Sequence, residues 1–242
     1  MSWATVRRDR LGDGTPVAVK DTTYDARLEA DGLQALARAG APVPEVIDVD
    51  EHQLVMEWVE GPADWERVGR GLAAAHLSTA DAFGYHRHNV IGPLVQDNTW
   101  HRDWADFYVE RRIVPFLADL PADLARRLRR AGDGPLRDLL GSHRPRPGLV
   151  HGDLWSGNVV AGRSLVDPAV CYADPELDRA FSELFGGLPA RMWAAHDEVA
   201  PPAEGWRDRL PALQLYHLLV HVRLFGGHYV TMVAERLAVY GW

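Results

Sequence analysis

The sequence is poor in cysteine: its 242 residues include one, Cys171, which excludes a disulfide bond within the chain. It also has no run of about 18 or more apolar residues and no signal peptide, so we expect a cytoplasmic protein without a membrane span. Positive charge is scarce as well. The 26 Lys and Arg residues are outnumbered by 34 Asp and Glu residues, and this balance argues against nucleic acid as a partner.

The apolar pattern of the chain changes near residue 60. Short apolar runs at residues 16–20, 42–49 and 53–61 predict strands, and residues 24–40 predict a helix. Beyond Asp64 the spacing is mostly helical, and the predicted helices are residues 65–77, 100–117, 122–140, 174–185, 210–225 and 229–240. The glycine and proline of EGPAD separate the two patterns. We therefore predict an α+β fold with a small β-rich lobe, residues 1–61, and a larger, mostly helical lobe, residues 62–242.

The segment LVHGDLWSGNVVAGRSLVDPA, residues 149–169, gathers polar side chains around two short apolar runs. Asp153 lies in a tight loop, and Asn158 stands at the start of a predicted strand. The glycine turn AGR then returns the chain, so that Asp167 ends a second strand beside Asn158. Oxygen ligands of this kind suit Mg²⁺, which predicts a metal site at Asn158 and Asp167. Asp153 is then placed to accept the proton of an attacking hydroxyl group.

Each of these residues also has an ordinary explanation. A single Asp or Asn in a loop commonly forms a turn or caps a helix. The joint pattern HGDxxxxN, followed by a hairpin and an apolar-Asp-Pro sequence, parallels the H-R-D-x-x-x-x-N loop of kinases. The combination therefore predicts phosphoryl transfer with ATP and Mg²⁺ as cofactors.

A kinase of this kind also needs a lysine on a strand of the small lobe, paired with a glutamate on a helix. The run VAVK supplies Lys20, and Glu29 in the following helix is its natural partner. Three other carboxylates of the same region, Glu45, Asp25 and Asp31, remain alternatives. An exposed Lys–Glu pair without function would contribute little to stability.

The run LVMEWVEG ends at the predicted boundary between the lobes. Backbone groups there can bind the edge of an adenine ring, and a methionine can gate the pocket. The predicted nucleotide-binding residues are Met56, Glu57, Trp58 and Val59. Taken alone, this run is better explained as an ordinary buried strand, and the nucleotide-binding interpretation depends on the other kinase motifs.

Several motifs together resemble one family. LVHGDLWSGN, LVDPAVCYADPELDRAFSELFGG, FGYHRHNVIGPLVQDNTWHRDWADFYVERR and LFGGHY are similar to the fructosamine kinase (ketosamine-3-kinase) family, relatives of aminoglycoside phosphotransferases and choline kinases. The resemblance covers roughly residues 16–229. It implies a protein-kinase-like fold and transfer of the ATP γ-phosphate to a sugar hydroxyl of a ketoamine. Such an acceptor is a fructosamine or ribulosamine, free or on a glycated protein lysine, and the reaction serves deglycation.

The resemblance also implies a role for each matching residue. Lys20 holds the α- and β-phosphates and Glu29 orients it. Asp153 is the base, and Asn158 and Asp167 bind Mg²⁺. Residues 57–59 form the hinge against the adenine.

The chain departs from the family pattern before Lys20. Members usually begin with a strand, a glycine-rich loop over the phosphates and a second strand, whereas nineteen residues precede Lys20 here. Residues 2–20 predict the second and third strands of that pattern, joined at GDG, so we expect a truncated small lobe or a start codon assigned too late. Two other functions stay open: an aminoglycoside or other small-molecule phosphotransferase, and a nucleotide-binding protein with impaired turnover.

The acceptor side is predicted from few residues. Trp155, two positions after the proposed base, can stack on a sugar ring, although a tryptophan is also a common core residue. Glu176 and Asp178 can each hold a cationic amine or cap the helix that begins near them, and for Asp178 we favour the structural role. His151 is expected to brace the catalytic loop through hydrogen bonds.

Overall fold

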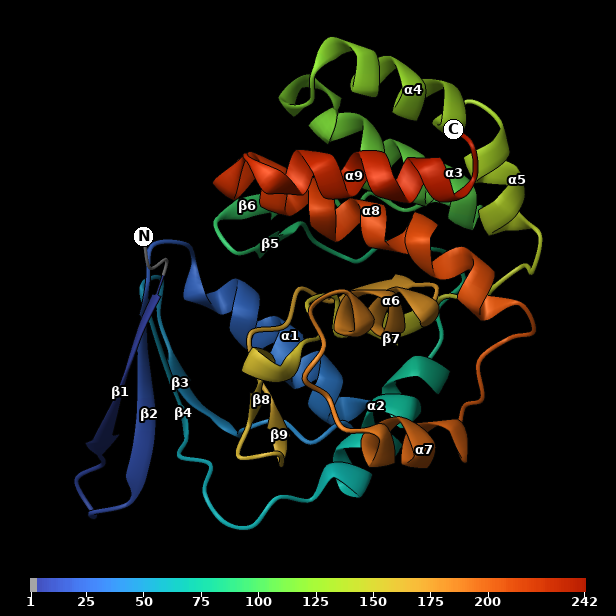
Figure 1. The fold of residues 1–242 in the computed structure, drawn as a ribbon. Helices are drawn as coiled ribbons and strands as arrows, with labels where there is room; N and C mark the ends of the chain where they lie inside the picture. The colour runs from blue at the N-terminus through green and yellow to red at the C-terminus, as the bar shows by residue number, and fades with distance from the viewer. Residues whose placement is uncertain (1–3) are drawn as a thin grey trace.

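The computed structural model describes residues 4–242 and begins with a four-stranded antiparallel sheet (Figure 1). Its strands are β1 (Ala4–Arg10), β2 (Pro16–Thr22), β3 (Val46–Val49) and β4 (Gln53–Glu57), in the order β1-β2-β4-β3. The predicted pair of strands joined at GDG is confirmed over β1 and β2, and Ser2 and Trp3 lie outside the described residues. The predicted strand at residues 42–49 is shorter than expected, because its first residues include two prolines.

Helix α1 (Ala26–Arg38) packs on this sheet. The Asp25 side chain accepts a hydrogen bond from the Arg27 N–H and so begins the helix. Ala30 and Leu33 face the sheet and form a small core with Leu54 and Met56. Because α1 also contributes buried residues to the large core of the rest of the chain, it connects the sheet to the helical part.

The larger part of the chain is mostly helical, as predicted. Its α-helices are α2 (Trp65–Leu77), α3 (Trp104–Tyr108), α4 (Ala122–Gly132), α5 (Pro135–Gly141), α6 (Glu176–Phe185), α7 (Ala190–Asp197), α8 (Trp206–Phe225) and α9 (His228–Val239). Two-stranded ladders join β5 (Asn89–Ile91) to β6 (Leu94–Gln96), β7 (Gly148–Val150) to β10 (Cys171–Ala173), and β8 (Val159–Val160) to β9 (Ser164–Leu165). Over residues 4–242 no helix has the length and apolar character needed to cross a bilayer.

Two predicted long helices are interrupted in the structure. The helix predicted at residues 100–117 begins only at Trp104 and continues as a π-helical turn (Val109–Ile113) and a 3₁₀ helix (Val114–Asp119). Pro115 has no N–H to donate, so it cannot continue a regular helix there. The helix predicted at residues 122–140 breaks before Pro135, which starts α5 as prolines commonly do. Helix α7 was not predicted.

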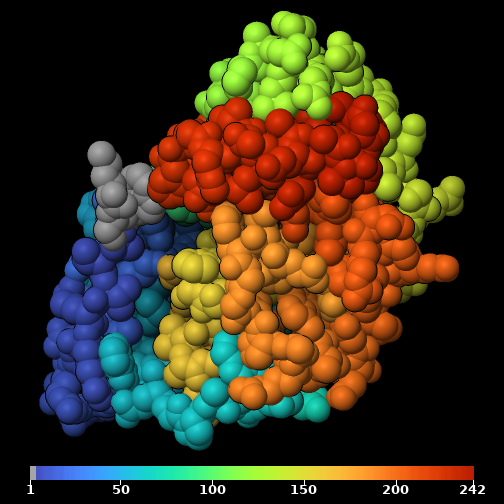
Figure 2. Space-filling view, viewed as in Figure 1, coloured from blue at the N-terminus to red at the C-terminus, as the bar shows by residue number. Residues whose placement is uncertain are grey.

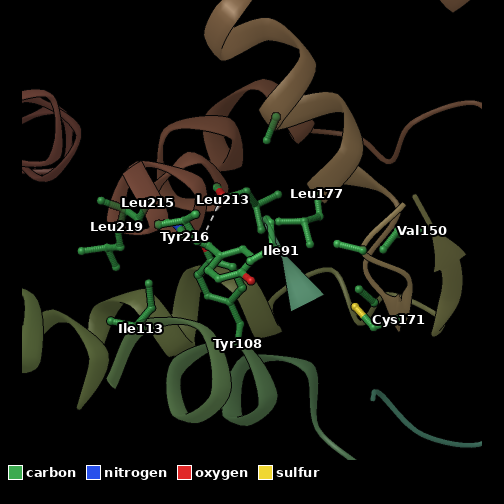
Figure 3. Packing of buried hydrophobic residues seen from close by; sticks show 14 of the residues in the cluster. Ile91, Tyr108, Ile113, Val150, Cys171, Leu177, Leu213, Leu215, Tyr216 and Leu219 are labelled. Atoms are coloured by element: carbon green, nitrogen blue, oxygen red, sulfur yellow. Dashed lines mark hydrogen bonds between the residues drawn. The ribbon is translucent and has the colours of Figure 1, made fainter. Parts of the chain in front are cut away.

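The main core surrounds helix α8 (Figure 3). Tyr108 of α3 is fully buried, and its hydroxyl donates to the carbonyl oxygens of Ala212 and Leu213 at 2.8 and 2.9 Å. The same hydroxyl accepts a hydrogen bond from the Tyr216 N–H. These bonds hold α8 firmly, and the far end of α8 forms one wall of the candidate site.

Candidate active site

A cavity of about 630 Å³ brings together most of the predicted site residues. Strand β2 and helix α1 contribute one residue each, and the segment around residues 150–168 contributes four. Those six lining residues are Lys20, Glu29, Asp153, Trp155, Asn158 and Asp167. In Figure 2 the yellow segment that carries the last four lies at the surface, between the blue N-terminal part and the orange helices.

The loop that carries Asp153 is fixed through its backbone. Gly152 has a φ of +82°, and a Cβ atom there would lie 2.1 Å from the Ala169 carbonyl oxygen, so only glycine fits. The Asp178 carboxylate accepts hydrogen bonds from the N–H groups of His151 and Gly152, at 2.7 and 2.8 Å. His151 bonds the Val166 carbonyl oxygen through Nε2 at 2.9 Å. The predicted bracing by His151 and the structural role of Asp178 are therefore confirmed.

Asp153 is oriented by Asn158. The Asn158 Nδ2 donates to the Asp153 carbonyl oxygen at 2.8 Å and to its Oδ2 at 3.0 Å. Burial in the cavity wall raises the pKa of Asp153 to about 7, although the Asn158 hydrogen bond works in the opposite direction. A carboxylate with a pKa near neutral pH is well suited to act as a general base.

Lys20 lies between two carboxylates. Its Nζ is 2.7 Å from Glu29 Oε2 and 2.7 Å from Asp167 Oδ1. The Lys20 and Glu29 side chains are 2% and 3% exposed. Burial alone would lower the pKa of Lys20, but the two carboxylates outweigh burial and hold it above its ordinary value, so the ammonium group stays charged. Of the carboxylates that the sequence left open, the structure selects Glu29.

Tyr24 belongs to the same cluster, and the sequence pattern did not predict it as a site residue. Its hydroxyl donates to Glu29 Oε2 at 2.7 Å, and its ring lines the cavity. Tyr24 precedes α1 and lies outside both regular elements, so no periodic pattern singles it out. The opposite wall holds further residues that were not predicted, among them His221, Phe225 and Tyr229.

Two oxygen atoms at the base of the cavity suit a hard divalent cation. Asp167 has a φ of +57°, rare for a residue other than glycine, and its Oδ1 is bonded to Lys20. Lys20 bonds the Oδ1 of Asp167, and Asn158 donates through its Nδ2, so the second carboxylate oxygen of Asp167, Oδ2, and the amide oxygen of Asn158, Oδ1, are the candidate ligands. A carboxylate and an amide oxygen are ligands that Mg²⁺ accepts, so the residues present fit this ion.

Trp155 stands at the mouth of the cavity, where its side chain is 40% exposed. A Cβ atom at Gly157 would lie 2.3 Å from the indole ring, so the ring folds back over the backbone at this glycine. The WSG sequence therefore fixes an exposed aromatic face two residues from Asp153.

Residues 56–59 are not among the described residues that line this cavity. Met56 is buried in the small core beneath the sheet, and the Glu57 N–H already donates to the Glu45 carbonyl oxygen at 2.9 Å. That N–H is consequently not free for an adenine ring. The nucleotide-binding role of Met56, Glu57, Trp58 and Val59 stays a prediction.

Glu176 lies elsewhere, and its predicted contact with an acceptor amine is not supported. Arg209 binds both of its carboxylate oxygens, at 2.6 and 2.8 Å, and both side chains are 6% exposed. Glu176 lines a second cavity of about 340 Å³ with His143 and Asp174. Although these three side chains lie close together, His143 is paired with Asp174 and Glu176 with Arg209.

Comparisons with known proteins identify the family and the fold. The sequence profile of the fructosamine kinase family matches residues 18–239. A Synechocystis protein described as a "probable ketoamine kinase" is 40% identical over 233 residues, which cover 87% of this chain and 77% of the relative. The crystal structure of a Thermobifida fusca protein described as a "putative fructosamine-3-kinase" is 40% identical, with a TM-score of 0.88 over 99% of this chain and 90% of that chain.

A more distant structure shows the fold alone. A choline/ethanolamine kinase family protein of Mesorhizobium loti is 17% identical, with a TM-score of 0.59 over 96% of this chain and 86% of that chain. The fold and the matching relatives define a phosphotransferase of the protein-kinase-like class that uses ATP and an alcohol group as acceptor. Within that class, the chain belongs to the fructosamine kinase family.

Proposed function

We propose that the protein transfers the γ-phosphate of ATP to a sugar hydroxyl of a small ketoamine, of the fructosamine or ribulosamine type. The observation that carries this proposal is one cavity that holds a buried ammonium group, a carboxylate and an amide suited to Mg²⁺, and a second carboxylate with a raised pKa. The name of the Synechocystis relative supports ketoamines as the acceptor class. A role in deglycation follows from that acceptor class.

On the nucleotide side, Lys20 contacts the phosphates, and Glu29 and Tyr24 fix its position. Asn158 Oδ1 and Asp167 Oδ2 would hold Mg²⁺, which neutralises charge on the phosphates when it is bound. Lys20 already contacts Asp167, so the ammonium group and the predicted metal ligand are placed together before any nucleotide arrives. This preorganisation reduces the rearrangement that binding requires.

On the acceptor side, Asp153 accepts the proton of the attacking hydroxyl group. The Asn158 amide holds the Asp153 carboxylate in one orientation, which fixes the direction in which that proton leaves. The exposed face of Trp155 offers a stacking surface for the sugar ring. The aromatic rings of Phe185, Phe225 and Tyr229 line the same cavity and provide faces that favour a cationic amine.

The acceptor class is tested by measuring ADP formation with a panel of a fructosyl-amine, a ribulosyl-amine, an aminoglycoside and choline. We expect turnover with the ketoamines, and turnover lowered by about 10²–10⁴-fold when Asp153 is replaced by Asn. Turnover with the aminoglycoside alone would support the alternative phosphotransferase. ATP binding without ADP formation from any acceptor would support a nucleotide-binding protein with impaired turnover.

Replacing Trp155 by Ala is expected to lower kcat/KM for a ketoamine by roughly tenfold, since an aromatic contact contributes about 0.5–1.5 kcal/mol beyond area burial. The affinity for ATP should not change, because stacking positions the acceptor only. Steady-state kinetics with each substrate varied in turn measure both effects. Trp100→Ala is the matched control, since Trp100 is similarly exposed but lines a different cavity. Equal losses in the two variants would contradict the role of Trp155.

Replacing Asp167 by Asn removes a charged oxygen ligand while keeping the size of the side chain. We expect the Mg²⁺ concentration that gives the half-maximal rate to rise by roughly 10- to 100-fold. The measurement is a Mg²⁺ titration of the initial rate at saturating ATP. An unchanged Mg²⁺ dependence in a folded Asp167→Asn protein would remove this residue from the metal site.

A further inference from the structure

Two buried histidines form a hydrogen-bonded chain behind the catalytic loop. His76 on α2 and His196 on α7 are each 4% exposed, and His76 Nδ1 lies 2.9 Å from His196 Nε2. The other nitrogen of each ring faces a carboxylate. His76 Nε2 is 3.1 Å from Asp178 Oδ2, and His196 Nδ1 is 2.9 Å from Asp197 Oδ1. The chain Asp197–His196–His76–Asp178 therefore links α7 and α2 to the carboxylate that braces the loop.

Both carboxylates accept hydrogen bonds from other groups as well. Asp178 accepts from two backbone N–H groups, and although burial opposes its ionisation, the bonds from His76 and from the loop hold the pKa of Asp178 below its ordinary value. Asp197 accepts from the guanidinium of Arg179. Each outer ring nitrogen, Nε2 of His76 and Nδ1 of His196, must consequently carry a proton and donate it.

This assignment fixes the inner proton. A neutral imidazole has one N–H, so two neutral rings that donate outward would face each other with two bare lone pairs at 2.9 Å. One further proton between the rings makes that contact a hydrogen bond. Burial, and after it the electrostatic influence of His76, lower the pKa of His196, which opposes two separate protonated rings.

We propose that His76 and His196 share one proton, and that this buried imidazolium is a positioning group for the catalytic loop. It keeps Asp178 ionised and in place, and Asp178 holds the backbone of His151 and Gly152 next to Asp153. The charges also balance: two carboxylates face one guanidinium and one shared proton. Without that proton the cluster would bury an uncompensated negative charge, which is costly.

Two pairs of charged or titratable side chains lie near the two histidines. Across the second cavity, His143 is bonded to Asp174, and Glu176 to Arg209. Arg146 lines the same cavity and bears a positive charge, so it opposes the shared proton. The negative charge that favours this proton therefore comes from Asp178 and Asp197, partly offset by Arg179.

The proposal predicts a loss of activity at alkaline pH. The shared proton is bound below its pKa and is released as the pH rises through that pKa. One of the two neutral rings must then carry its N–H on the nitrogen that faces the other ring. That ring loses its hydrogen bond to Asp178, if it is His76, or to Asp197, if it is His196. Release of Asp178 loosens the backbone at Gly152, so kcat falls on the alkaline side while the KM for ATP stays constant.

The first test is independent of activity. NMR of the protein with ¹⁵N-labelled histidine should show one strongly deshielded exchangeable proton that correlates with nitrogens of both His76 and His196. This signal should be absent from His196→Leu. Two neutral rings in the wild-type protein near neutral pH would overturn the proposal, whether or not any variant folds.

The second test uses kinetics with ATP and a fructosyl-amine, and it rests on the function proposed above. His196→Leu should lower kcat by about tenfold without raising the KM for ATP, as outer positioning groups commonly do. His196→Gln should restore kcat, because its amide N–H can donate to His76 Nδ1 without an added proton, and it should also remove the alkaline loss. His143→Gln, in the same cavity, is the control and should retain the wild-type kcat and pH profile.

The two tests separate two kinds of failure. No turnover in the wild-type protein with any ketoamine would contradict the proposed acceptor, while the NMR result would still decide the shared proton. Wild-type kcat and pH profile in His196→Leu would overturn the positioning role. Equal losses in His196→Leu and His196→Gln would show that the ring only fills space, and would also overturn it.

Discussion

Replacing Asp153 by Asn lowers kcat by about 10²–10⁴-fold, the usual contribution of general base catalysis, while ATP still binds with nearly unchanged affinity. The amide keeps the size of the side chain and its neighbour Asn158, but it cannot accept the proton of the acceptor hydroxyl. Single-turnover kinetics measure the chemical step, and calorimetry measures ATP binding. Because Lys20 is bonded to Glu29 and Asp167, whereas the Asp153 carboxylate is bonded to Asn158, the nucleotide side of the site should be preserved.

A matched substitution controls for the loss of one charge. Asp48→Asn removes a carboxylate from an exposed position on β3 and should leave both kcat and ATP affinity unchanged. If calorimetry shows that Asp153→Asn no longer binds Mg²⁺-ATP, Asp153 belongs to the metal site and is not the base.

The catalytic loop was predictable because its residues are close together in sequence. Asp153, Asn158 and Asp167 lie within one loop and one short hairpin, so local turns alone determine how they converge. Lys20 was also predictable, since a buried strand followed by an acidic helix leaves few partners for its charge. The contact between Lys20 and Asp167 was not, because it joins residues 147 positions apart.

The acceptor side could not be derived in the same way. Glu176 and Asp178 both stand in the first turn of α6 with no sequence feature that tells which faces the cavity. In the structure neither does: Asp178 holds the catalytic loop, and Glu176 is paired with Arg209 on α8. Partners that are distant in sequence decide the role of each carboxylate.

The fold shows the same division. Strands and long amphipathic helices such as α2 followed from periodicity, because one face of each packs on a single core. The segment from Trp104 to Asp119 also has helical spacing, yet it passes through three kinds of helix before it ends. The spacing of apolar residues does not indicate where tertiary packing and Pro115 change the backbone hydrogen bonds from one helix type to another.

Lys20 is the only lysine of the chain, and every other residue in the Lys and Arg count is arginine. The compact ammonium group fits between Glu29 and Asp167, whereas a guanidinium is larger and planar. We therefore expect Lys20→Arg to lose most phosphoryl transfer despite keeping the charge. The measurement is kcat/KM for ATP.

Lys20→Met is expected to destabilise the fold by about 3–5 kcal/mol, since it leaves Glu29 buried without its cation. Glu29 Oε1 already has no hydrogen-bond partner among the described residues, so little else compensates for the charge. The double variant Lys20→Met/Glu29→Leu removes both charges and should recover most of the lost stability, as buried ion pairs replaced by apolar residues of similar volume commonly do. Phosphoryl transfer should stay absent in the double variant, because the contact with the phosphates is gone. Denaturant unfolding measures the free energy of unfolding of each variant, and ADP formation measures phosphoryl transfer. If the double variant is no more stable than Lys20→Met, the unpaired charge of Glu29 is not the cause of the destabilisation.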